Sequence, residues 1–163
     1  MPSDAIKLPT IKERKDQLVA CAKAVANLAE YPKIEATPAR LVRHDLEIRR
    51  VLDAIVRRWT LMAPTHYISA GAAKMSEAAR RGEHVVPCKV LVDRMIMHPR
   101  RCRTLLETAV IIASVTPEEH RTLGGIFTHH EPLYREMLAA DVSQLPSLGK
   151  ERYSNFDIEL HDV

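Results

Sequence analysis

Apolar residues recur at steps of three and four near the start of the chain, which is the spacing of one face of an α-helix. Between residues 11 and 30 this face holds Leu18, Val25 and Leu28, and Pro32 follows soon after. Proline removes a backbone donor and disfavours helix continuation. The pattern therefore predicts an amphipathic helix over residues 11–30.

A second and longer helix is predicted over residues 38–63. Thr37-Pro38 supplies an N-cap followed by a first-turn proline, which is a common helix start. The apolar face then runs from Leu41 to Trp59, and Pro64 closes the segment. We expect this helix to be the longest in the fold.

Shorter helical and β-prone segments follow one another in the rest of the chain. Thr116-Pro117-Glu118-Glu119 combines an N-cap threonine, a first-turn proline and a glutamate three residues on, which indicates a capping box at a helix start. Gly82 is expected to act as a left-handed stop for a helix over residues 66–81. Further helices are expected over residues 88–98, resuming over 100–107 after a break at Pro99, and over residues 116–124 and 126–141, with short strands over residues 83–86 and 109–115.

These elements predict a mainly α fold in which one domain covers residues 1–163. It should contain five or six helices and a minimal two-strand β element. Residues 1–10 and 143–163 are expected to be irregular or mobile, because neither segment has a clear periodic pattern.

The composition narrows the class of protein. The 163 residues are 46% hydrophobic and 28% charged, which excludes a disordered chain, a collagen-like fibre and a disulfide scaffold. No apolar run reaches the roughly 18 residues of a membrane-spanning helix, and no signal-peptide core is present. We therefore expect a cytoplasmic protein without a membrane partner. Cys21, Cys88 and Cys102 are odd in number and widely spaced, which favours reduced thiols.

The net charge of +3 conceals an uneven distribution along the chain. Residues 40–103 hold fourteen Lys or Arg against six Asp or Glu, whereas residues 104–163 hold four against ten. Arg43, Arg50 and Arg57 repeat every seven residues, so they share one side of the predicted second helix. Arginine suits phosphate because its planar guanidinium donates in a fixed fork. The basic segment is either a solvated face or a surface for a polyanion.

Two short sequence segments near the middle of the chain place candidate catalytic side chains on predicted strands and at the start of a predicted helix. Glu83-His84-Val85-Val86-Pro87 places a carboxylate and an imidazole on a predicted strand, and Ser114-Val115-Thr116-Pro117-Glu118-Glu119-His120 leads from a second strand into a helix. This order resembles the His-Me finger nucleases, also called HNH endonucleases, over residues 80–123. Residues 88–107 are predicted to be helical, whereas the family usually has a short loop there.

The resemblance implies a metal-dependent nuclease acting on DNA or RNA. It assigns His84 as the general base that takes a proton from water, because imidazole titrates near neutral pH. Glu83 and His120 would hold one divalent cation, Mg²⁺ by abundance, with Mn²⁺, Ni²⁺ or Zn²⁺ as alternatives because one ligand is nitrogen. The arginines expected to hold the nucleic acid are Arg43, Arg50, Arg57, Arg80, Arg81, Arg94, Arg100, Arg101 and Arg103. An inactive finger that keeps the shape without the metal stays open.

Other functions also fit the sequence. The chain can be a non-catalytic helical module, a regulator or defence-related factor, whose Arg-rich side at residues 40–58 binds nucleic acid or an acidic protein. It can also be an interaction protein that forms a homo-oligomer through residues 38–62. His129-His130-Glu131 is interpreted as an incidental cluster. Cys88 and Cys102 permit a zinc site with the histidines, although structural zinc sites usually have paired ligands two to four residues apart.

Overall fold

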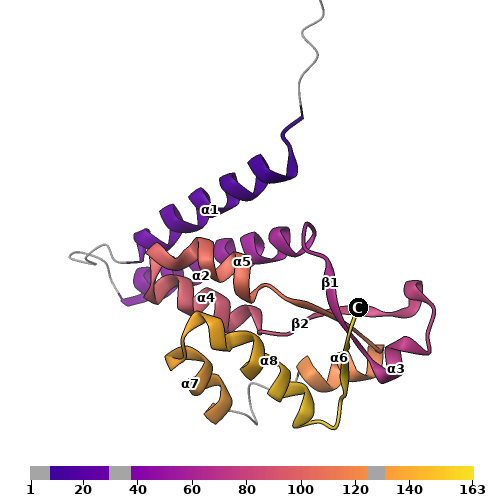
Figure 1. Ribbon diagram of the computed structural model, residues 1–163. Coiled ribbons are helices and arrows are strands. Elements are labelled where there is room, and N and C mark those ends of the chain that lie inside the picture. The colour runs from indigo at the N-terminus through magenta and orange to yellow at the C-terminus, as the bar shows by residue number, and fades with distance from the viewer. Residues whose placement is uncertain (1–7, 30–37, 125–130) are drawn as a thin grey trace, which may run out of the picture.

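The computed structural model describes residues 8–29, 38–124 and 131–163, and for residues 38–44 it describes the backbone alone. The fold is mainly α with a small mixed sheet (Figure 1). The α-helices are α1 (Ile11–Leu28), α2 (Pro38–Thr60), α3 (Ala70–Ala73), α4 (Cys88–Met97), α5 (Cys102–Ala109), α6 (Pro117–Gly124), α7 (Glu131–Ala139) and α8 (Leu145–Ser154). The strands are β1 (Thr65–Ser69), β2 (Arg81–His84), β3 (Ile112–Val115) and β4 (Leu160–Asp162), and short 3₁₀ helices are η1 (Glu77–Ala79), η2 (Pro99–Arg101) and η4 (Val142–Gln144).

Helices α1, α2, α4 and α5 pack together at one end of the molecule (Figure 1). Their apolar faces meet in one core, in which Leu52, Val56, Leu91 and Leu105 are fully buried. The predicted stripe of α2 explains this packing, because its buried residues recur on one side of the helix. Val86, which follows β2, and Val110, which precedes β3, also belong to this core.

The sheet has the strand order β2-β3-β1-β4, so β2 and β4 lie at its edges. Strand β2 pairs antiparallel with β3, β1 runs parallel to β3, and β4 pairs antiparallel with β1. A second core joins the sheet to α6 and α8 through Val85, Ala113, Leu123 and Tyr153. This core fixes β2, α6 and α8 against one another.

The structure confirms a mainly α fold with a minor β element. Helices α1, α2 and α4 lie close to their predicted ranges, and the predicted start of α6 is also correct. The Thr116 hydroxyl accepts from the Glu119 amide at 3.1 Å, and the Glu119 carboxylate accepts from the Thr116 amide at 2.7 Å. These are the two reciprocal bonds of a capping box.

The predicted helix over residues 66–81 is wrong. The segment forms β1, the short helix α3, η1 and the start of β2. Gly82 is part of β2 and pairs with Ser114 of β3, and it does not have the positive φ that a left-handed stop requires. The alanines favour a helix locally, but pairing with β3 and β4 decides the conformation of β1.

The prediction of an irregular tail over residues 143–163 is also wrong. This segment forms most of η4, α8 and the edge strand β4, and with the unpredicted strand β1 the sheet has four strands instead of two. Strand β3 begins only at Ile112, because the chain up to Ala109 completes α5. The first seven residues lie outside the described part of the chain. Within the described ranges, no helix combines the length and the apolar character needed to cross a bilayer.

Candidate active site

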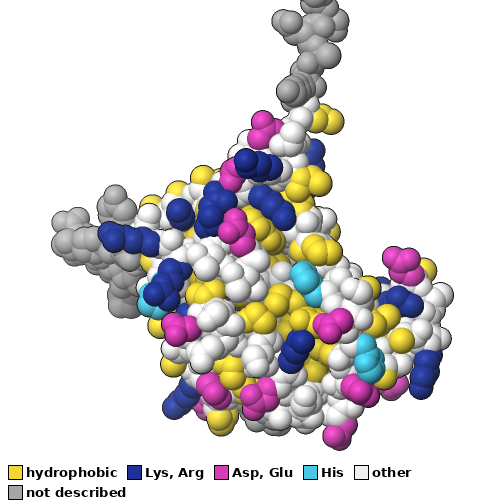
Figure 2. All heavy atoms as spheres, viewed as in Figure 1, with side chains coloured by type: hydrophobic (Ala, Val, Ile, Leu, Met, Phe, Trp, Pro, Cys, Tyr) yellow, Lys and Arg dark blue, Asp and Glu magenta, His cyan; other side chains and the backbone are white. Residues whose placement is uncertain are grey.

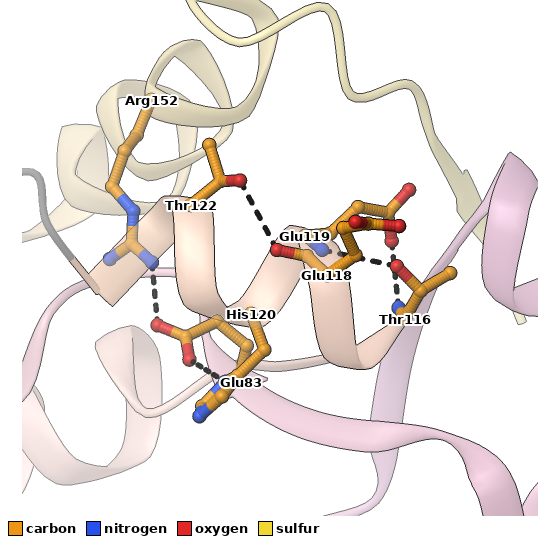
Figure 3. Close-up of polar contacts among 7 residues, drawn as sticks. All are labelled: Glu83, Thr116, Glu118, Glu119, His120, Thr122 and Arg152. Carbon is orange, nitrogen blue, oxygen red and sulfur yellow. Dashed lines mark hydrogen bonds and ion pairs between the residues drawn. The ribbon is translucent and has the colours of Figure 1, made fainter.

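A carboxylate between a guanidinium and an imidazole lies at the edge of the sheet (Figure 3). Glu83 Oε2 is 2.7 Å from His120 Nδ1, and Glu83 Oε1 is 2.5 Å from Arg152 Nη2. The three side chains come from β2, α6 and α8. The Arg152 side chain is 3% exposed and the Glu83 side chain 15%, whereas His120 is 47% exposed. Arg152 is therefore buried and Glu83 half-buried, and the more exposed His120 lies on the solvent side of Glu83.

The antiparallel pair β2–β3 and the start of α6 bring Glu83 and His120 together. Glu83 lies opposite Ala113 on β3, and β3 leads directly into α6. The capping box at Thr116 fixes where α6 begins, and Glu119 also accepts from the Ser69 hydroxyl at 2.6 Å. His120 thus lies one turn into a helix whose start is fixed by the bonds that Ser69 and Thr116 donate to one oxygen of the Glu119 carboxylate.

His84, the next residue on β2, contacts a different element. Its Nε2 lies 2.7 Å from the Thr60 hydroxyl at the end of α2. Burial lowers the pKa of His84, and the nearby charge of Glu83 opposes this effect only in part. The imidazole is therefore neutral at neutral pH, which is the state that a general base requires.

Glu83, His84 and His120 all line one cavity of about 570 Å³. Successive strand residues point to opposite faces, yet both Glu83 and His84 reach the cavity because β2 is an edge strand. Among the described residues that line it, four are cationic and two are carboxylates, so the cavity has a positive excess. The charged lining residues are Arg49, Asp53, Arg57, Glu83, Lys89 and Arg152.

Besides Arg152, the three other cations that line the cavity also have partners. Arg57 donates to Asp53 at 2.7 Å, and the Lys89 ammonium lies 4.7 Å from the centre of the Tyr134 ring. Arg49 is bonded to Asp93 of α4. Each contact orients a cation at the cavity wall without burying it completely.

The predicted arginines are spread over several surfaces. Arg57 lines the cavity, and Arg50 and Arg81 are exposed. Arg80 donates to the carbonyl of Met75 at 2.9 Å. The Arg43 side chain lies outside the described residues. The predicted arginines thus do not form one continuous patch around Glu83.

The remaining predicted arginines lie near α4 and α5. Arg94 is buried and donates to the carbonyl of Leu138 at 2.5 Å, so its prediction as a nucleic-acid contact is wrong. Arg103 binds Asp16 at 2.7 Å. Arg100 and Arg101 are exposed and line a separate hollow. On the face seen in Figure 2, Lys and Arg side chains gather mainly over the upper helices, away from most of the acidic side chains below.

Glu83 and His120 form a two-residue donor set for a cation. Among the described residues, no group of three or more His, Cys, Asp or Glu side chains can hold a metal ion, so His84 does not join them as a third ligand. An open carboxylate–imidazole pair suits a divalent cation that keeps water or phosphate as its other ligands. These two residues are the ones that would hold the implied metal, with Arg152 on the second carboxylate oxygen.

The other proposed metal clusters do not gain support. Cys102 is buried in the helical core, whereas Cys88 lines the cavity beside His84. Burial raises the pKa of Cys88 to about 12, which disfavours the thiolate needed for zinc. His129 and His130 lie outside the described residues, and Glu131 is paired with Arg135.

Arg152 and Thr60 are the site residues that the sequence analysis missed. Arg152 lies in the segment predicted to be irregular, although Leu145, Leu148 and Arg152 already have helical spacing. Thr60 could not be identified from the sequence, because no sequence pattern connects a threonine at the end of a predicted helix to His84.

Comparisons with models of known protein families, with curated proteins and with solved structures give no match. The function is therefore inferred from the residues of this site.

Proposed function

We propose that this protein is a metal-dependent phosphodiesterase that cleaves DNA or RNA on a diverged His-Me finger. The observation that carries the proposal is the 2.7 Å contact between Glu83 and His120 on the wall of the cavity that His84 also lines. The two residues are far apart in sequence and meet through the β2–β3 pair and α6. A β-strand pair followed by a helix is the arrangement that the resemblance implies.

His84 is the general base of the proposed reaction. A phosphodiester resists hydrolysis because its negative charge repels hydroxide, so a group that takes a proton from water lowers the barrier. Burial keeps His84 neutral, and it therefore has a lone pair for that proton. The oxygen of this water forms the new bond to phosphorus as the bond to the leaving oxygen breaks.

Glu83 and His120 hold the divalent cation. Arg152 orients Glu83, since its guanidinium bonds to the carboxylate oxygen that does not face His120. When bound, Mg²⁺ or a similar cation supplies positive charge against the scissile phosphate and the leaving oxygen. His120 has to release any proton on Nδ1 before that atom can serve as a ligand.

The cationic wall of the cavity holds the nucleic-acid backbone. Arg49, Arg57 and Lys89 project from α2 and α4 beside His84. Guanidinium and ammonium groups neutralise phosphates without reading the bases, so this wall favours binding to the backbone regardless of sequence.

Nicking of a supercoiled plasmid tests the proposal. Wild-type protein should nick the plasmid with Mg²⁺ or Mn²⁺ and should lose activity with a chelator. His84→Ala should lower the rate by about 10²- to 10⁴-fold, because general-base catalysis has this magnitude. His161→Ala is the matched control, because His161 is an exposed histidine on β4 that does not line the cavity.

Equal rates for His84→Ala and wild type would contradict the nuclease. Binding to nucleic acid that weakens steeply with salt, without cleavage in any metal, would instead support the non-catalytic module.

A further inference from the structure

Thr60 makes two hydrogen bonds through one hydroxyl group. Its Oγ1 lies 2.9 Å from the carbonyl oxygen of Val56, one turn earlier in α2, and 2.7 Å from His84 Nε2. A threonine hydroxyl has a single proton, and a carbonyl oxygen only accepts. Because this one proton can be donated to only one partner, its position determines which group donates in each of the two bonds.

In the first arrangement each of the two bonds has one donor and one acceptor. Thr60 donates to Val56, as threonines in helices often do toward the carbonyl four residues earlier. Its oxygen then accepts from His84 Nε2–H, and His84 Nδ1 keeps a free lone pair. In the reverse direction Thr60 would donate to His84, and two oxygen lone pairs would face each other at 2.9 Å without a proton between them. The first direction is favoured.

We propose that Thr60 is a positioning residue that holds His84 in the Nε2–H tautomer, so that Nδ1 is the atom that accepts the proton from water. The inference rests on the proposed function for its catalytic meaning, whereas the tautomer itself is a property of the folded protein. Thr60 does not touch the reacting atoms and acts only through His84.

The site is suited to such control. The neutral form of an imidazole carries its proton on one of two nitrogens, and His84 Nε2 lies 2.7 Å from the Thr60 hydroxyl. The charged groups that act on the ring are Glu83, Arg57, Asp53 and Arg152. Because these groups carry charges of both signs, their effects on the ring oppose one another. The direct hydrogen bond therefore decides which nitrogen carries the proton.

Nitrogen-15 NMR of the imidazole side chains tests the tautomer without any assay of activity. In wild type, His84 should have a protonated Nε2 and an unprotonated Nδ1. Thr60→Ser keeps the hydroxyl and should preserve that state. Thr60→Val keeps the shape of the side chain without the hydroxyl, so the two tautomers should become mixed.

The same variants are then compared in plasmid cleavage. Thr60→Val should lower kcat by more than about tenfold with little change in KM, because only the fraction of His84 with a free Nδ1 is active. Thr60→Ser should restore most of the rate. Thr122→Val is the matched control, because Thr122 bonds the Glu118 carbonyl at 3.1 Å in the same way but on an exposed face of α6.

The outcomes separate the two proposals. A protonated Nδ1 in wild-type His84 overturns the assignment, even if Thr60→Val does not fold. An unchanged kcat in folded Thr60→Val overturns the positioning role. If wild type has the expected tautomer but cleaves no nucleic acid with any metal, the proposed function fails, and the catalytic meaning of Thr60 fails with it while the hydrogen-bond assignment stands.

Discussion

Glu83 has two roles that depend on its place at the sheet edge. It is buried enough to need a cationic partner, and Arg152 meets this need at 2.5 Å from a position that is itself 3% exposed. Its second oxygen faces His120 and the cavity. One carboxylate thus joins α8 to β2 and also lines the cavity, where we propose that it binds the metal.

Glu83→Gln should lower the free energy of unfolding by about 3 kcal/mol, because it leaves the buried Arg152 guanidinium without a counter-charge. Glu159→Gln is the control, since Glu159 is an exposed glutamate that also faces a histidine, and its loss should cost less than about 1 kcal/mol. Urea denaturation measures both changes. Equal stability of the two variants would show that Arg152 does not depend on Glu83.

The three thiols should differ in reactivity. Cys21 is exposed, whereas burial raises the pKa of Cys88 to about 12 and that of Cys102 to about 11. Because the thiolate is the reactive form, a thiol reagent at neutral pH should label Cys21 quickly and the other two only after unfolding. Labelling of Cys88 should accelerate as the pH rises toward its pKa. Rapid labelling of all three native thiols at neutral pH would contradict this.

Among the elements, α8 shows why part of the fold escaped prediction. Gly149 lowers its intrinsic helix propensity, yet the fold requires glycine there because a Cβ would lie 2.8 Å from the Val85 carbonyl oxygen. The sequence indicates only that this glycine lowers helix propensity. The benefit comes from close packing of α8 on the chain that follows β2, which also brings Arg152 to Glu83.

Gly149→Ala should therefore destabilise the protein by about 1–3 kcal/mol, as overpacking does in other cores. Gly124→Ala is the matched control, because Gly124 is also helical and a Cβ there would meet nothing within 4 Å. Thermal unfolding of the two variants measures the difference. The close packing of α8 would be disproved if both alanines were tolerated equally.

Local signals predicted other elements correctly. The start of α6 depends on the capping box at Thr116, which involves only neighbouring residues. The pairing of Glu83 with His120 was expected from the resemblance, since both residues lie in its two segments. Strand β1 was missed because its conformation is set by distant partners on β3 and β4, which no local pattern near Tyr67 reveals.

At the scale of the whole molecule, the basic middle segment and the acidic end of the chain do not form separate basic and acidic parts of the fold. Arg103 from the basic middle segment binds Asp16 of α1, and Arg152 from the acidic end supplies a cation to the cavity. Strand β4 also returns the end of the chain to β1. The positive excess at the cavity is thus assembled from distant segments, and the charge of any one segment is a poor guide to it.

The central claim is that Glu83 and His120 share one divalent cation beside His84. Titration with Mn²⁺ under NMR observation tests it directly, because the paramagnetic ion broadens the signals of nuclei near it. At equimolar Mn²⁺ we expect residues 82–85 of β2 and residues 119–121 of α6 to broaden first in wild type, and this selective broadening to disappear in His120→Ala. Uniform weak broadening, or selective broadening at acidic side chains elsewhere that persists in His120→Ala, would contradict the account.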